Sequence, residues 1–148
     1  MSIEDLYYPD ALLAEILGTL RRVALLGASA DPARASHEVM AFLLERGVEV
    51  VPVNPRLAGQ TILGRTVVAS LAQVPGPIGM VDVFRGVDAL DEVADQVLAL
   101  ACPPPVVWMQ LGVWSPAPVA RLEAQGITVV ANRCPKIEWK RLGAIAAV

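Results

Sequence analysis

The residues with the clearest chemical meaning follow a short apolar run near the amino terminus. Residues 23–27 lead into the small-residue turn Gly27-Ala28-Ser29, and a segment with helical periodicity comes next. A turn of this kind between a strand and a helix presents backbone N–H groups at the positive end of the helix dipole, where phosphate binds well. Small residues at such a turn also let a helix approach a strand. The turn alone therefore leaves a structural role and phosphate binding equally open.

Three arginines are expected near the same turn. Arg34 follows it in the chain, Arg56 follows the apolar run 48–53, and Arg85 follows the run 80–84. A single arginine of this kind is most often a solvated surface residue. Three of them beside a phosphate-type turn, in a chain with net negative charge, favour a polyanionic ligand with an apolar part.

The sequence lacks the residues that several common binding sites and reactions require. A dinucleotide fingerprint would need glycine where Ser29 and Pro32 stand, and Asn54 ends the second apolar run where NAD requires a ribose-binding acid. There is no Walker A sequence, and no G-x-S-x-G elbow surrounds Ser29. His37 is the only histidine and the two cysteines are far apart in sequence, so a zinc site and metal catalysis are not expected.

Residues that follow several strands can meet only if those strands end at one edge of a sheet. Apolar runs alternate with stretches of helical periodicity, which is typical of βαβ units in a parallel sheet covered on both faces. The sequence therefore predicts an α/β fold: a Rossmann-like, doubly wound parallel sheet in three layers, with an extra N-terminal helix. The predicted strands are 23–27, 48–53, 80–84, 106–110 and 127–131, with a small one at 66–68. The predicted helices are 38–46, 87–101, 118–125 and 136–147, and the additional helix runs to residue 20 from Asp10 as its N-cap.

Length and composition bound the class of protein. The 148 residues suit a single domain spanning 1–148, and 55% hydrophobic against 18% charged residues excludes a disordered chain. The net charge of -3 provides no broad basic face, so no nucleic-acid partner is expected. The longest apolar stretch, 97–109, contains three prolines and is too short to span a membrane. Acidic residues stand where a signal peptide would be basic, so we expect a cytoplasmic protein.

An ordered set of short motifs resembles the small stand-alone CoA-binding proteins. The resemblance runs from about Arg22 to Leu142, and the fold it implies is similar to the nucleotide-binding domain of the succinyl-CoA synthetase α subunit. One departure is Asn132, which stands where the resemblance leads us to expect aspartate. The motifs are Gly27-Ala28-Ser29, Pro32-x-Arg34-x-Ser36, Pro52-Val53-Asn54-Pro55, Ser70-Leu71, Asp82-Val83-Phe84-Arg85, Trp108-Met109-Gln110-Leu111-Gly112-Val113 and Arg133-Cys134.

The resemblance implies coenzyme A as the cofactor and assigns its parts to groups of residues. The groups are Gly27, Ala28, Ser29 and Arg34 for the phosphates, Asn54, Pro55 and Arg56 for the adenosine end, Phe84 and Arg85 as a cover over the nucleotide, and Gln110, Leu111 and Gly112 along the pantetheine arm. The synthetase transfers phosphate through a histidine in a separate domain. This chain shows neither that domain nor a spare histidine, so ligase activity is not expected.

Two functions of different class remain open at this point. The first is a non-catalytic binding, carrier or sensor module for coenzyme A or an acyl-CoA. The second is a nucleotide-dependent oxidoreductase or transferase that uses the same pocket. The sequence shows no recognisable catalytic set, which favours binding. The apolar surplus and the additional helix are compatible with a homodimer.

Asp82 and Cys134 carry expectations of their own. Asp82 lies inside an apolar run and is either a functional carboxylate or a buried acid paired with a neighbour. Cys134 precedes Pro135 and is predicted to cap the last helix, where the helix dipole would favour its thiolate. It either pairs with the thiol of coenzyme A or is a small buried apolar residue, and Cys102 serves as the comparison at the opposite edge of the sheet.

Overall fold

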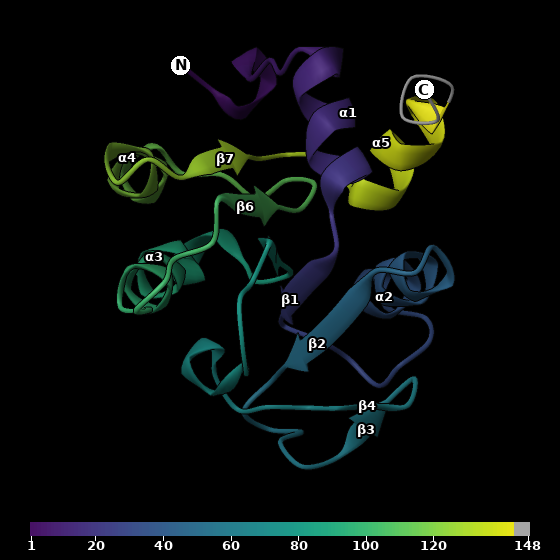
Figure 1. The fold of residues 1–148 in the computed structure, drawn as a ribbon. Helices are drawn as coiled ribbons and strands as arrows, with labels where there is room; N and C mark the ends of the chain where they lie inside the picture. Colours follow the sequence, from purple (N-terminus) through teal and green to yellow (C-terminus); the bar gives the residue numbers. More distant parts are fainter. Residues whose placement is uncertain (144–148) are drawn as a thin grey trace.

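Five parallel strands form the sheet around which the computed structural model is built, and the structure describes residues 1–143 (Figure 1). The strand order is β2-β1-β5-β6-β7, and every neighbouring pair is parallel. The chain winds to one side of β1 and then to the other, so the sheet reverses its winding between β1 and β5. This arrangement confirms the predicted doubly wound fold. The strands are β1 (Arg22–Leu26), β2 (Glu49–Val53), β5 (Met80–Val83), β6 (Val106–Met109) and β7 (Thr128–Val130).

Helices cover both faces of the sheet (Figure 1). One face packs against α1 (Asp10–Thr19), α2 (Ala35–Glu45) and α5 (Pro135–Arg141). The other face packs against α3 (Leu90–Leu98) and α4 (Pro116–Ala124). Short 3₁₀ turns occur at η1 (Ile3–Asp5), η2 (Leu71–Gln73) and η3 (Val87–Ala89).

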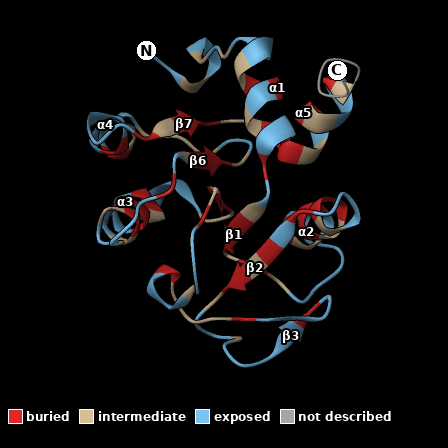
Figure 2. Cartoon of the chain, viewed as in Figure 1, coloured by how far each residue is buried: buried red, intermediate tan, exposed pale blue. Residues whose placement is uncertain are grey.

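The continuous apolar character of the strands follows from this burial on two sides. In β1, Val23 and Leu25 belong to the cluster beneath α1, α2 and α5, whereas Ala24 and Leu26 belong to the cluster beneath α3 and α4. Successive side chains point to opposite faces, so a strand covered on both faces needs apolar residues at every position. Figure 2 shows the buried positions concentrated in the strands and on the inner sides of the helices.

The predicted strand at 66–68 is wrong in detail. The structure has an antiparallel hairpin of β3 (Thr61–Ile62) and β4 (Arg65–Thr66), followed by a single parallel bridge between Val53 and Val68. The hairpin turns at Leu63 and Gly64, both with positive φ (49° and 77°), as a two-residue reversal requires. Two-residue strands are too short to leave a periodic pattern in the sequence.

Helix ends differ from the predictions by a few residues. Pro9 is the N-cap of α1, and Asp10 is its first residue rather than the cap. The predicted helix 87–101 begins with the 3₁₀ turn η3 and ends at Leu98. The last helix runs from Pro135 to Arg141, and the predicted part beyond residue 143 lies outside the described residues.

The amino-terminal segment is joined to the other end of the chain. The Tyr8 hydroxyl accepts a hydrogen bond of 2.9 Å from the Ala131 N–H, and burial raises the pKa of that hydroxyl. Arg133 donates to the carbonyl of Leu6 at 3.1 Å, and Arg141 donates to Asp10 at 2.9 Å. These contacts hold α1 against β7 and α5. Within residues 1–143, no helix combines the length and the apolar character that crossing a membrane requires.

Candidate functional site

The turn after β1 lies at the reversal point of the sheet, and its glycine permits a close backbone approach. Gly27 has φ +90°, and a Cβ built on it would lie 2.5 Å from the carbonyl oxygen of Phe84. The N–H groups of Gly27 and Ala28 both donate to the carbonyl of Val53, at 3.0 and 3.2 Å. The expectation that the whole turn offers unpaired N–H groups is therefore wrong for these two residues, because the neighbouring strand β2 already uses them.

The unpaired donors lie slightly further along the chain. Within the described residues, the N–H groups of Ser29 and Ala30 and those of Ala35 and Ser36 in the first turn of α2 have no acceptor. The N-cap, Arg34, makes no side-chain cap. A helix that begins in this way presents free N–H groups and the positive end of its dipole together.

The Asn54 side-chain amide makes hydrogen bonds within the site with both its nitrogen and its oxygen. Its Nδ2 donates to the carbonyl of Ala28 at 2.8 Å, and its Oδ1 accepts from the Arg56 N–H at 2.9 Å. One amide thus joins the turn after β1 to the segment after β2. This explains why a short polar residue follows the second strand, and it makes Asn54 a positioning residue for Arg56.

Two adjoining cavities open at this edge of the sheet, with volumes of about 480 Å³ and about 370 Å³. Both lie within the range that small-molecule sites usually have. They share Gly27, Asn54 and Arg56. The first is lined by Gly27, Ala28, Ser29, Arg34, Ala35, Ser36, Asn54, Arg56, Leu57 and Phe84. The second is lined by Leu26, Gly27, Val53, Asn54, Pro55, Arg56, Arg85 and Glu92.

The charge at the two cavities is mainly positive. Arg34 and Arg56 are exposed, and neither makes an ion pair with any residue of the described chain. Arg85 lies 3.8 Å from Glu92, in a loose and partly exposed pair. The structure therefore brings the three predicted arginines to one edge of the sheet, with two of them uncompensated.

The predicted residues Gln110, Leu111 and Gly112 do not line either cavity. They follow β6, the next strand beyond β5, at the same edge of the sheet. The Gln110 Oε1 is buried and has no hydrogen-bond partner in the part of the chain that the structure describes, and Leu111 is 52% exposed. The Gly112 N–H donates to Asn132 Oδ1 at 2.8 Å. Asn132 has φ +56°, a conformation that asparagine tolerates better than most residues.

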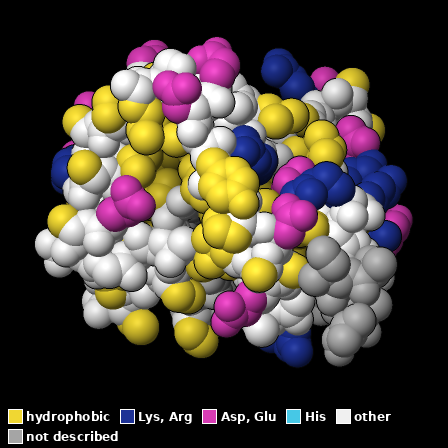
Figure 3. Space-filling model, turned by 90° about the horizontal axis from the view of Figure 1, so that it is seen from above, with side chains coloured by type: hydrophobic (Ala, Val, Ile, Leu, Met, Phe, Trp, Pro, Cys, Tyr) yellow, Lys and Arg dark blue, Asp and Glu magenta, His cyan; other side chains and the backbone are white. Residues whose placement is uncertain are grey.

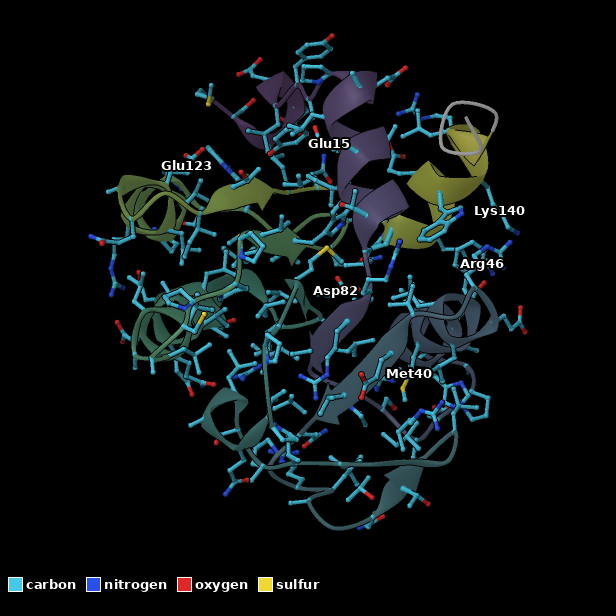
Figure 4. The ribbon with its side chains drawn as sticks, in the orientation of Figure 1. Glu15, Met40, Arg46, Asp82, Glu123 and Lys140 are labelled. Carbon is cyan, nitrogen blue, oxygen red and sulfur yellow. The ribbon has the colours of Figure 1, made fainter. Side chains whose placement is uncertain are left out.

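Asp82 lies in the central strand, in the middle of the molecule (Figure 4). Its neighbours in register are Leu25 and Trp108, it is fully buried, and neither carboxyl oxygen has a hydrogen-bond partner among residues 1–143. The interpretation of Asp82 as an acid paired with a neighbour is therefore wrong. Burial raises its pKa well above the usual value, since the charged form would lose its hydration without compensation.

The two cysteines differ in accessibility. Cys134 is the N-cap of α5, as predicted, but it is only 6% exposed and packs in the cluster beneath α1, α2 and α5. This environment is the one expected for a small buried apolar residue. Cys102 is exposed.

The sequence did not identify every residue that lines the cavities. Leu26, Ala35, Leu57 and Glu92 were missed, and Ser36 and Val53 were recognised only as parts of motifs. The signal for Ala35 and Ser36 was their place just after the phosphate-type turn. It was lost because apolar periodicity predicted a helix start at residue 38, whereas α2 begins at Ala35.

Comparison with known proteins identifies the family. Residues 21–140 match the CoA binding domain family. The uncharacterized protein YneT of Bacillus subtilis (strain 168) is 36% identical over 127 residues, which cover 86% of this chain and 91% of that protein. A Thermus thermophilus structure described as cell-free ID.343 shares 41% identity, with a TM-score of 0.86 over 91% of this chain and 99% of its own. A hypothetical protein from Pyrococcus horikoshii OT3 shares 34% identity, with a TM-score of 0.84 over 96% of each chain. The fold, the order of the motifs and these matches agree, and the chain belongs to the CoA binding domain family.

Proposed function

We propose that this protein binds coenzyme A or an acyl-CoA at the carboxyl edge of β1 and β5, as a binding, carrier or sensor module without catalysis. One observation carries the proposal. The first turn of α2 has two N–H groups without acceptors among the described residues, and they border a cavity that Arg34 and Arg56 flank. Free helix N–H groups and unpaired guanidinium groups are what a pyrophosphate requires.

The placement of the ligand follows from the two cavities. The pyrophosphate would lie on Ser29 and the start of α2. The adenosine end would lie along Pro55 and Arg56 in the second cavity, beneath Arg85, while Phe84 would cover the part of the nucleotide in the first cavity. The pantetheine arm would extend toward Gln110, whose buried Oε1 is an acceptor that could pair with an amide N–H.

The residues around the first cavity support a binding role. They include arginines, a serine pair and an asparagine amide, but no carboxylate, histidine or cysteine that could act as a general base. The Ser29 hydroxyl accepts from the Asp31 N–H at 3.1 Å, which stabilises the local turn. Glu92 in the second cavity faces Arg85.

Calorimetric titration with coenzyme A, acetyl-CoA, NAD, NADP and ATP tests this function. We expect coenzyme A to bind most tightly, because it combines a pyrophosphate, a 3′-phosphate and an extended arm. Similar affinity for acetyl-CoA would support an acyl-CoA ligand. Preference for NAD or NADP would instead support the nucleotide-dependent enzyme and overturn the proposal.

Arg56 is expected to recognise the 3′-phosphate. Arg56 lines both cavities, and its backbone N–H is held by Asn54. Arg56→Gln should weaken binding of coenzyme A by roughly tenfold, the effect of losing about 1.4 kcal/mol. It should leave dephospho-CoA nearly unaffected. Arg121→Gln is the matched control, because Arg121 pairs with Asp95 between α3 and α4. Equal weakening of both ligands would place Arg56 on the pyrophosphate instead.

A further inference from the structure

Among the described residues, Glu92 is the only carboxylate that lines either cavity at the proposed ligand site. It stands in the first turn of α3 and lines the second cavity together with Arg56 and Arg85. A carboxylate repels the phosphate groups that the two arginines would attract. The presence of Glu92 in this cavity therefore needs a reason other than phosphate binding.

The contact with Arg85 does not use the hydrogen-bonding capacity of this carboxylate. The Glu92 Oε2 lies 3.8 Å from the Arg85 guanidinium, which is too far for a hydrogen bond. The other oxygen, Oε1, accepts one bond of 3.2 Å from the Gln96 side-chain amide. Within residues 1–143, Oε2 accepts no hydrogen bond, so it can accept one from a ligand.

Other ion pairs of the molecule are tighter. Figure 3 shows the face that includes α1, where Lys and Arg side chains lie among Asp and Glu side chains. Between α5 and α1, Arg141 donates to Asp10 at 2.9 Å, and between α4 and α3, Arg121 donates to Asp95 at 2.6 Å. An acid that serves to neutralise an arginine forms a bond of about this length. The longer separation at the second cavity leaves Glu92 available to a ligand.

The proposed placement of coenzyme A identifies the group that Glu92 would meet, and the inference rests on that placement. Arg56 is expected to bind the 3′-phosphate in the second cavity. The 2′-hydroxyl is attached to the neighbouring carbon of the same ribose, so it lies in the same cavity. Many NAD sites bind this hydroxyl through an acid that follows the second strand. In this chain Asn54 stands at that place, and its amide is already engaged within the site.

We propose that Glu92 recognises the 2′ position of the ribose, where its carboxylate accepts a hydrogen bond from the hydroxyl and repels a phosphate. Arg56 and Arg85 alone would not exclude a 2′-phosphate, because a guanidinium binds phosphate on either carbon. Rejection of the wrong isomer requires a repulsive group on the 2′ side. Glu92 thus makes the site select a 3′-phosphorylated nucleotide over its 2′-phosphorylated isomer.

Calorimetric titration with coenzyme A and with its isomer that carries the phosphate at the 2′ position tests the proposal. The two ligands share the pyrophosphate and the arm, so the ratio of their dissociation constants isolates the ribose. The wild type should bind coenzyme A more tightly. Glu92→Gln removes the charge and should lower the preference by roughly tenfold, mainly through tighter binding of the isomer. The release of Arg85 affects both ligands and largely cancels in the ratio.

A second variant tests the hydrogen bond to the hydroxyl. Glu92→Ala removes the acceptor as well as the charge, whereas Glu92→Gln keeps an acceptor. Dephospho-CoA, which has a free 2′-hydroxyl, should therefore bind Glu92→Ala roughly two- to tenfold more weakly than Glu92→Gln. Asp95→Asn is the matched control, because it removes the same charge one turn further along α3, outside both cavities. It should leave both measurements unchanged.

The outcomes separate this inference from the proposed function. An unchanged preference in Glu92→Gln would overturn the inference, as would equal affinity of the two variants for dephospho-CoA. Either result would leave coenzyme A binding itself in place. A wild-type protein that binds neither isomer would overturn the proposed function and the inference with it.

Discussion

Replacing Ala35 by proline would delete a single N–H group at the start of α2. Ala35 is the first residue of the helix, a position where proline is favoured because the N–H has no partner within the helix. The residue before it, Arg34, has φ -83° and ψ 143°, which are values that a following proline prefers. The backbone therefore accepts the substitution without rearrangement, and only the donor is lost.

The size of the effect follows from the kind of bond that would be lost. A hydrogen bond from an N–H group to a charged phosphate contributes about 1.5–3 kcal/mol in a sheltered site. At about 1.4 kcal/mol for each factor of ten, Ala35→Pro should weaken coenzyme A binding by roughly ten- to a hundredfold. The stability of the free protein should stay the same or rise by about 0.4–1 kcal/mol, because proline restricts the unfolded chain.

Calorimetric titration of coenzyme A and thermal unfolding of the free variant separate these two effects. Ala35→Ser is the matched control, because it keeps the N–H group and changes the side chain by one hydroxyl. Binding to this control should be close to that of the wild type. A folded Ala35→Pro variant with undiminished affinity would refute the placement of the pyrophosphate at the start of α2.

Three further predictions concern stability and reactivity. Asp82→Val should raise the free energy of unfolding by about 1–3 kcal/mol, since it removes an unpartnered buried group. The folded state raises the pKa of Asp82, so the stability of the wild type is highest below the ordinary pKa of 3.8. As the pH rises from there toward the raised pKa, the free energy of unfolding should fall by about 1.4 kcal/mol per pH unit. Urea unfolding should therefore show the stability difference between the wild type and Asp82→Val widening with pH. Gly27→Ala should destabilise the protein by at least roughly 1–3 kcal/mol, measured by the same method, because alanine is strained at φ +90° and its Cβ would also meet the Phe84 carbonyl; an unchanged midpoint would contradict this reading of the turn. Peptide mapping after incubation with coenzyme A disulfide should find the adduct on exposed Cys102 rather than on buried Cys134, and labelling of Cys134 first would revive its pairing with the ligand thiol.

The fold was predictable because its signals are local and repeated. Each strand of the main sheet is a short run with an apolar interior, apart from Asp82, and every strand except β2 is followed by an α-helix. A strand that is buried on both faces needs apolar residues at successive positions, so this run is visible in the sequence. The hairpin of β3 and β4 was not predictable in the same way, because its two-residue strands depend on the turn at Leu63 and Gly64.

The sequence could predict where the candidate site lies, but not which of its backbone N–H groups are unpaired. Its position follows from the strand ends, which the sequence marks with Gly27 and Asn54. Which N–H groups are unpaired depends on a contact between the turn after β1 and the end of β2, since the carbonyl of Val53 accepts hydrogen bonds from two of them. The type of a residue does not show whether its backbone N–H already donates to a carbonyl of the neighbouring strand. The lack of a partner for Asp82 has the same origin, because it depends on what packs around the side chain.

The contacts that join the amino-terminal segment to β7 and α5 set an order of events during synthesis. Leu6, Tyr8 and Asp10 find their partners only at Ala131, Arg133 and Arg141, more than 120 residues later. At typical translation rates, α1 waits on the order of ten seconds between leaving the ribosome and meeting the surface it packs on. The first helix to be made is thus among the last to dock. Until then its apolar residues are exposed to other proteins, and a chain that stops before β7 is complete leaves α1 without that surface.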